Sequence, residues 1–358
     1  MKKIILLILL LIPLNVKGIN TSATSSILMD MDSNRILYEE NIHNVRSVAS
    51  ISKIMTALLA IESGKLDDKV TIGDEIKTAY GSGIYIKEGE ILTLRDLLYG
   101  LMLRSGNDAA LAIAHYVVGS VDEFVNMMNS RAKELKMTNT TFNNPSGLDS
   151  DKGNYSTAYD MALLTSYAMK LDEYKKITST KKYALTTNKN TYIWINKNKL
   201  LSLYKYTTGG KTGFTEIAKR TLVTTASKDN INLVVVTLND GNDWQDHQNL
   251  FEYGFNNYTN IKLLEKGNIN IYSEEYYEDY DLYVKNNFSY LIGNNEEDSV
   301  IFKYKLEKLR KIKNKDKVGE VEIYIGDKKI HKESIYIKEK KKENKNVFSK
   351  IKDWIVNI

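Results

Sequence analysis

Three short motifs follow one another along this chain at long intervals, and each is weak by itself. They are Ser50-Ile51-Ser52-Lys53, Ser105-Gly106-Asn107 and Lys211-Thr212-Gly213. The S-x-x-K spacing also occurs at Ser130/Lys133, Ser179/Lys182, Ser202/Lys205 and Ser349/Lys352. Only the first occurrence precedes both other motifs and begins a strongly apolar segment. We therefore expect a fold that brings these three distant segments to one site.

The first motif supplies a nucleophile and a base. A serine hydroxyl is a weak nucleophile at neutral pH and requires a base. We expect Ser50 to begin a helix, which places Lys53 one turn away on the same face. Lys53 can act as the base if burial and a second cation, Lys211, lower its pKa. In the alternative interpretation, Ser50 is only a helix N-cap and Lys53 is a solvated lysine.

The second motif fits a proton relay. Ser105 can pass a proton between the base and a leaving amine. The side chain of Asn107 offers both a donor and an acceptor, so it can orient Lys53 and a substrate amide together. We therefore assign Ser50, Lys53, Ser105 and Asn107 as candidate catalytic residues.

The third motif fits a substrate-binding strand. Lys211 and Thr212 can bind a carboxylate, and Gly213 permits close approach of the backbone to a substrate. The N–H of Phe214 is a candidate oxyanion donor beside that of Ser50. Lys211, Thr212, Gly213 and Phe214 are therefore the candidate substrate-binding residues.

The order of the expected elements indicates an α+β fold. Apolar periodicity predicts helices over 50–64, 92–103, 108–118, 121–136 and 244–258. Strand-like runs flank polar turns at 24–30 and 35–39, and again at 221–226 and 231–236. Turn residues predict a loop over 143–147. We expect an antiparallel sheet flanked by helices, built from both ends of a domain that carries an α-helical insert.

The length of 358 residues favours more than one domain. We expect a signal peptide over 1–18, because two lysines precede an unbroken apolar run. The main domain would span 19–262. A shift to short alternating runs predicts a small all-β domain over 263–338. The segment 339–358 combines a lysine run with a spaced apolar stripe and a tryptophan, which favours an amphipathic helix at a membrane surface over packing on the protein's own core.

The composition excludes several classes of function. The chain has no cysteine, which excludes thiolate catalysis and cysteine-based zinc sites. The histidines, His43, His115, His247 and His331, lie far apart without helical metal-site spacing, so we expect no metal. The net charge of +5 is not concentrated in a basic stripe with stacking aromatics, so we expect no nucleic-acid partner.

The three motifs resemble those of low-molecular-mass penicillin-binding proteins of the D-alanyl-D-alanine carboxypeptidase type. The similarity extends over nearly the whole chain, through the segments 46–56, 105–110, 142–148, 157–162 and 210–215. It implies a β-lactamase-like or transpeptidase-like fold and an exported enzyme without cofactors. Such an enzyme removes the terminal D-alanine from peptidoglycan stem pentapeptides through an acyl-enzyme on Ser50, and β-lactams acylate it. The resemblance also implies that the C-terminal helix holds the enzyme at the outer face of the cytoplasmic membrane.

Two segments depart from the commoner pattern of the resembled family. Many members carry a glycine where this chain has Lys219, and the stretch 239–247 differs from the arginine-bearing stretch of some relatives. The residues that hold the substrate carboxylate beyond Thr212 are therefore open. Arg220 is a candidate for a supporting charge, with a structural role as the alternative.

Other functions compete with this interpretation. A class A β-lactamase requires a glutamate followed four residues on by an asparagine between the second and third motifs, and no such pair lies between Asn107 and Lys211. Glu252 and Asn256 have that spacing but follow the third motif. A non-catalytic membrane-associated module that binds the cell wall is the other alternative. The sequence does not separate carboxypeptidase from transpeptidase or endopeptidase, because all three use the same acyl-enzyme.

Overall fold

The computed structural model describes residues 19–149, 152–271 and 275–340. The chain divides into two units between Asn256 and Asn257, and each is described here by itself. The predicted signal peptide, 1–18, and nearly all of the predicted tail, 339–358, lie outside the described residues. Among the described residues, no helix is both long enough and apolar enough to span a membrane.

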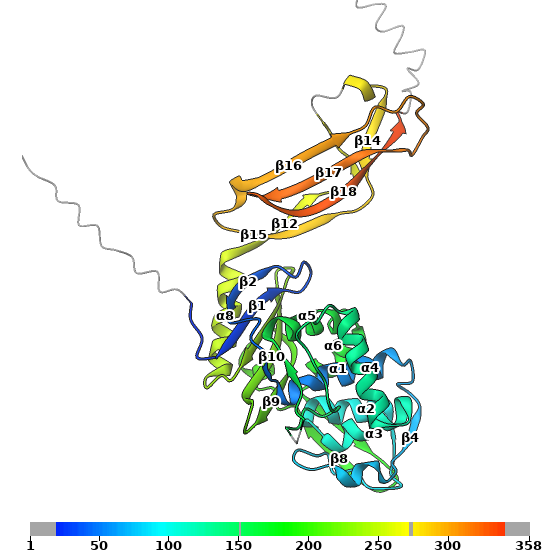
Figure 1. The fold of residues 1–358 in the computed structure, drawn as a ribbon, viewed down its shortest axis with the longest axis vertical. Coiled ribbons are helices and arrows are strands. Elements are labelled where there is room, and N and C mark those ends of the chain that lie inside the picture. The colour runs from blue at the N-terminus through cyan, green and yellow to red at the C-terminus, as the bar shows by residue number, and fades with distance from the viewer. Residues whose placement is uncertain (1–18, 150–151, 272–274, 341–358) are drawn as a thin grey trace, which may run out of the picture. The chain divides into compact units, whose positions relative to one another are not determined.

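The first unit is organised around one five-stranded antiparallel sheet (Figure 1). Its strand order is β2 (Ile36–Glu40), β1 (Ser25–Asp30), β11 (Ile231–Leu238), β10 (Lys219–Lys228) and β9 (Thr207–Thr215). Strand β1 pairs with β11 in a register that sets Ile27 against Val236. The N-terminal hairpin thus completes a sheet begun by C-terminal strands, which confirms the expected α+β arrangement.

Helices fill the chain between β2 and β9. They are α1 (Lys53–Glu62), α2 (Leu94–Tyr99), α3 (Asn107–Val118), α4 (Val121–Glu134), α5 (Ala158–Ala168), α6 (Asp172–Ser179) and α7 (Leu200–Leu203), and α8 (Asp243–Asn257) follows β11. A 3-10 turn, η1 (Ala49–Ser52), precedes α1, and a single π-helical turn, η3 (Gly100–Arg104), follows α2. The helix expected over 92–103 is therefore three elements, since its first residues belong to the strand β5 (Ile91–Thr93).

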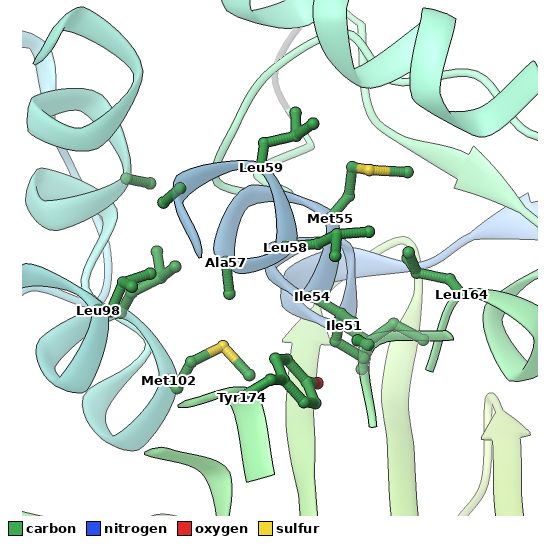
Figure 2. Packing of buried hydrophobic residues seen from close by; sticks show 14 of the residues in the cluster. Ile51, Ile54, Met55, Ala57, Leu58, Leu59, Leu98, Met102, Leu164 and Tyr174 are labelled. Atoms are coloured by element: carbon green, nitrogen blue, oxygen red, sulfur yellow. The ribbon is translucent and has the colours of Figure 1, made fainter. Parts of the chain in front are cut away.

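Helix α1 lies at the centre of the apolar core. Every residue from Lys53 to Ala60 is buried, and apolar side chains surround the helix on several sides (Figure 2). Met102 and Tyr174 belong to the same buried cluster. A helix that is apolar all round requires such a position. Its first residue, a lysine, is therefore held inside the protein.

Three small antiparallel pairs and a further 3-10 turn complete the first unit and were not predicted from the sequence. The pairs are β3 (Arg46–Ser47) with β6 (Tyr155–Ser156), β4 (Lys69–Thr71) with β5, and β7 (Lys182–Thr186) with β8 (Thr191–Ile195), and the turn is η2 (Asp74–Thr78).

The second unit is built from strands and two 3-10 turns over its described residues. Its larger sheet has the order β13 (Gly267–Asn268), β14 (Tyr280–Val284), β18 (Lys328–Glu339), β17 (Lys317–Ile325) and β16 (Val300–Leu306). The strands β12 (Tyr258–Leu264) and β15 (Phe288–Gly293) form a second sheet, and the turns are η4 (Glu275–Tyr277) and η5 (Glu297–Ser299). The unit begins a few residues before the expected boundary at 263, because β12 pairs with β15.

Candidate active site

The turn before α1 positions the first motif. Ala49 has a φ of +48°, and the 3-10 turn that it begins carries Ser50 into the helix. A positive φ in a non-glycine residue is uncommon and often marks a functional site. The Nζ of Lys53 donates to Ser50 Oγ at 3.0 Å. The expected one-turn contact between these two side chains is therefore present.

The amino group of Lys53 has two further acceptors. It donates to Asn107 Oδ1 at 2.7 Å and to the backbone carbonyl of Ser146. The side chain of Asn144 holds that loop in place, since its Oδ1 accepts from the N–H groups of Ser146 at 3.1 Å and Gly147 at 2.6 Å. The sequence predicted the loop from its turn residues, but it gave no sign that a carbonyl there meets Lys53.

Burial and like charges lower the pKa values of the two motif lysines. The pKa of Lys53 lies well below its usual range because of burial and the charges of Lys211 and Lys197, which outweigh the opposite effect of Asp108. Burial and the charge of Lys197 lower the pKa of Lys211 to about 7. Lys197, which sequence reasoning missed, therefore acts on both groups. The Nζ of Lys211 donates to the carbonyl of Thr212 at 2.6 Å.

Strand β9 lies against the turn that carries Ser50. A Cβ added at Gly213 would lie 3.0 Å from the backbone nitrogen of Ser50 and 3.2 Å from that of Ile51. It would also lie 2.4 Å from Thr221 Oγ1, which donates to the carbonyl of Val48 at 3.1 Å. Only glycine permits this approach. The third motif and the first, far apart in the chain, are in contact.

The second motif follows the π-helical turn after α2. Ser105 ends that turn in the left-handed conformation, with a φ of +65°, and its side chain is buried. π-Helical turns occur frequently at functional sites. Asn107 begins α3, and its Nδ2 donates to the carbonyl of Tyr80 at 2.6 Å. Its side chain is thus fixed with the oxygen toward Lys53.

These residues border a groove of about 330 Å³. Its lining comprises Ser50, Ser82, Ser105, Lys197, Thr212, Gly213, Phe214, Arg220, Thr221, Asp243 and Trp244. Five of the eight candidate residues named from the sequence belong to this lining. The other three, Lys53, Asn107 and Lys211, are buried. Phe214 is more than half exposed at the rim.

Arg220 lies on one wall of the groove, and two neighbouring side chains hold its guanidinium in place. The Nε of Arg220 donates to Asp243 Oδ2 at 3.1 Å, and a second guanidinium nitrogen donates to Asp243 Oδ1. The guanidinium also lies 5.7 Å from the ring of Trp244. Asp243 and Trp244 belong to the divergent stretch 239–247, so that stretch holds Arg220 in place.

Lys219 adopts a left-handed backbone conformation, with a φ of +57°. Many members of the resembled family carry a glycine at this position. In the part of the chain that the structure describes, no three histidine, aspartate or glutamate side chains are placed to hold a metal ion.

Comparisons with known proteins agree with the motifs. A family model described as D-alanyl-D-alanine carboxypeptidase matches residues 14–242, and one described as the penicillin-binding protein 5 C-terminal domain matches residues 258–343. The D-alanyl-D-alanine carboxypeptidase DacF of Bacillus subtilis is 39% identical over 220 residues, which cover 60% of this chain and 56% of that protein. The chain thus spans little more than half the length of this relative.

Other relatives are matched over most of their length. DacD of Escherichia coli is 30% identical over 345 residues, which cover 89% of this chain and 87% of that protein. The crystal structure of penicillin-binding protein 5 from Haemophilus influenzae superimposes with a TM-score of 0.76 at 28% identity, covering 89% of this chain and 97% of that one.

Proposed function

Because the chain belongs to the D-alanyl-D-alanine carboxypeptidase family of serine peptidases, we propose that it removes the terminal D-alanine from peptidoglycan stem pentapeptides. The reaction passes through an acyl-enzyme on Ser50, and water is the final acceptor. The observation that carries this proposal is the 3.0 Å contact between Lys53 Nζ and Ser50 Oγ, made by a buried lysine whose pKa is lowered.

The acylation step uses Lys53 as the base. In its neutral form, Nζ donates to Asn107 Oδ1 and to the carbonyl of Ser146 and accepts from the Ser50 hydroxyl across the 3.0 Å contact. It takes that proton as Oγ attacks the carbonyl carbon of the penultimate D-alanine. Burial beside another lysine supports the neutral form, since two close ammonium groups repel each other. Negative charge develops on the carbonyl oxygen, and the N–H groups of Ser50 and Phe214 are its proposed donors.

The terminal D-alanine leaves from the part of the groove that Ser105 lines. The hydroxyl of Ser105 gives its proton to the amine of the terminal D-alanine as the C–N bond breaks, and Ser105 takes up the proton held by Lys53, which becomes neutral again. Asn107 keeps Lys53 oriented through its 2.7 Å contact while the proton moves. A water molecule then attacks the ester carbonyl, its proton returns through Lys53 to Ser50 Oγ, and the shortened stem peptide is released.

The terminal carboxylate of the substrate binds in the part of the groove near Lys211 and Arg220. Thr212 and Lys211 form one part of its site, and Arg220 supplies a supporting charge. Asp243 and Trp244 hold the guanidinium at the groove wall, which lowers the entropy lost when it binds an anion. A β-lactam, which mimics the acyl-D-Ala-D-Ala group, acylates Ser50 in the same way.

The proposed cellular location rests on the sequences of two terminal segments. The segment 1–18 serves as a signal peptide and directs export. The amphipathic segment 339–358 rests on the outer face of the cytoplasmic membrane, where its lysines meet anionic lipid. The match of the second unit to the C-terminal domain model of penicillin-binding protein 5 supports this placement.

Release of D-alanine from a synthetic pentapeptide tests the proposed function. We expect wild-type protein to release it and Ser50→Ala to lose at least about 10³-fold in rate. Ser202→Ala is the matched control, because Ser202 is exposed and also precedes a lysine by three residues. Intact pentapeptide bound to the wild-type protein would instead identify a binding module. Undiminished release by Ser50→Ala would refute the assigned nucleophile.

A further inference from the structure

A single carboxylate joins the end of β9 to the segment that leads into the nucleophile turn. Asp149 Oδ1 accepts from the hydroxyl of Ser47 at 2.7 Å, and Asp149 Oδ2 accepts from the hydroxyl of Thr215. Ser47 precedes Ser50 by three residues, and Thr215 directly follows Phe214. Asp149 therefore connects the two segments that carry the proposed oxyanion donors, although the motifs gave no reason to select it.

The end of β9 depends on such a connection. β9 is an edge strand of the five-stranded sheet, in which it pairs with β10. Beyond Thr215 the chain turns back through 216–218, where the side chain of Ile217 is 61% exposed. An edge strand that ends at an exposed turn can open locally at low cost in free energy. The hydroxyl of Thr215 also accepts from the N–H of Ala218 at 3.0 Å, so the bond to Asp149 holds both the strand and its turn.

The carboxylate of Asp149 rests on a rigid base. Ser47 is buried and lies opposite Tyr155 where β3 pairs with β6. A Cβ added at Gly153 would lie 2.4 Å from Asp149 Oδ1, so the backbone passes close beside the carboxylate and limits its rotation. Hydrogen bonds that end on a carboxylate are also shorter and stronger than those between neutral groups. The position of Thr215 is therefore fixed relative to Ser47.

The loop that precedes Asp149 keeps its shape through other contacts. The side chain of Asn154 donates through Nδ2 to the carbonyl of Asn144 at 2.9 Å. The hydroxyl of Thr56, on α1, donates to the carbonyl of Pro145 at 2.7 Å. Loss of the Asp149 carboxylate should therefore leave in place the loop carbonyl that contacts the base.

We propose that Asp149 is a positioning residue that sets the spacing between the N–H groups of Ser50 and Phe214. This inference rests on the proposed function, in which both groups stabilise the charge that develops on the substrate carbonyl oxygen. Such donors act only when they lie about 2.7–3.1 Å from the place that the oxyanion will occupy. Without the connection, the end of β9 moves away from Ser50. Lys211 and Thr212 lie further inside β9, so the binding of the substrate carboxylate changes little.

Kinetics of a matched pair of variants test the proposal. Thr215→Val removes the hydroxyl and keeps the branched shape, whereas Thr215→Ser keeps the hydroxyl. We expect Thr215→Val and Asp149→Ala to lower kcat for D-alanine release about 30-fold, less than the roughly 10²–10³-fold loss on removing a donor outright. KM should change less than about twofold, because misplaced donors weaken the transition state alone. Thr215→Ser should keep at least about a third of the wild-type kcat.

A boronic acid reports on the oxyanion site directly. In N-acetyl-1-aminoethylboronic acid, boron replaces the reacting carbonyl carbon of the penultimate D-alanine. Ser50 Oγ adds to the boron, the hydroxyl proton passes to Lys53, and the tetrahedral boronate anion places an oxygen at the oxyanion site. The inhibition constant should rise about 30-fold in both slow variants, matching the fall in kcat. The pH at which the rate falls on the acid side should stay unchanged, because the contacts of Lys53 are kept.

Two further variants separate the connection from charge and from general loosening. Asp149→Asn keeps one accepting oxygen and an NH₂ that can donate to a hydroxyl, so its kcat should stay within about threefold of wild type. Thr187→Val removes a hydroxyl that donates to Glu90 at 2.5 Å in another hairpin turn, and it should release D-alanine normally.

Three results would overturn the positioning role and leave the proposed function intact. They are an unchanged kcat in Asp149→Ala and Thr215→Val, a fall in kcat without a rise in the inhibition constant of the boronic acid, and an equal fall in Thr187→Val. Failure of the wild-type protein to release D-alanine would instead overturn the proposed function.

Discussion

Replacing Gly213 by alanine tests whether β9 must touch the turn that carries Ser50. The added Cβ would lie 2.4 Å from Thr221 Oγ1 and 3.0 Å from the nitrogen of Ser50. Carbon normally meets such atoms at about 3.5 Å or more, so β9 must retreat by roughly 0.5–1 Å. Thr221 cannot turn aside without losing its 3.1 Å hydrogen bond to the carbonyl of Val48.

This displacement should cost far more in rate than in stability. Overpacking of a well-packed site costs about 1–3 kcal/mol of unfolding free energy. In a domain of this size each kcal/mol lowers Tm by about 2–4 °C. A displacement of about 1 Å near reacting groups can lower a rate about 100-fold. Gly213→Ala should therefore stay folded at 25 °C and acylate about 100 times more slowly.

The assay is the second-order rate of acylation by a fluorescent penicillin, measured beside a thermal melt. Gly241→Ala is the matched control, because a Cβ there meets nothing within 4 Å and its φ is not positive. We expect the control to change stability by less than about 0.5 kcal/mol and to acylate normally. If Gly213→Ala acylates at the wild-type rate, β9 does not require close contact with this turn and the account of the site is wrong.

Three further predictions concern charge and backbone strain. Since the pKa of Lys211 is lowered to about 7 from 10.5, the unfolded chain binds more protons between these values. The free energy of unfolding should rise with pH across that window, and Lys211→Met should flatten the rise in melts at stepped pH. Arg220→Lys should raise KM for the pentapeptide about tenfold with a smaller change in kcat, because lysine cannot pair with Asp243 in two places; an unchanged KM would exclude the arginine from the carboxylate site. Lys219→Gly should raise Tm by a few degrees by relieving a left-handed backbone, about 0.5–1 kcal/mol, whereas Lys219→Ala should not.

The main sheet was predictable because its strands carry strong local patterns. Strand-like runs around polar turns marked both hairpins, and the helical segments between them implied one sheet built from both ends of the domain. The structure adds that β1 pairs with β11. The short strand pairs β3–β6, β4–β5 and β7–β8 lack such patterns in the sequence. The β7–β8 hairpin turns through 187–190 without a glycine. Strand β12 continues directly from α8, whereas the predicted β domain began only at residue 263.

The chemistry of the site was more predictable than its surroundings. The candidates Ser50, Lys53 and Asn107, whose side chains meet in the structure, could be selected because side-chain chemistry fixes residue types at set spacings. The carbonyl of Ser146 left no such trace, since any residue supplies one. Lys197 is one of 50 basic residues and reaches the groove only through the fold, so its sequence position gave no reason to select it.

The most direct test of the central claim is to map the acyl group after brief reaction with penicillin. The claim is that buried, neutral Lys53 activates Ser50. Mass spectrometry of a digest should place the adduct on Ser50 in wild-type protein and find none in a folded Lys53→Met variant. An adduct on another serine, or one formed equally fast without the Lys53 amine, would contradict it.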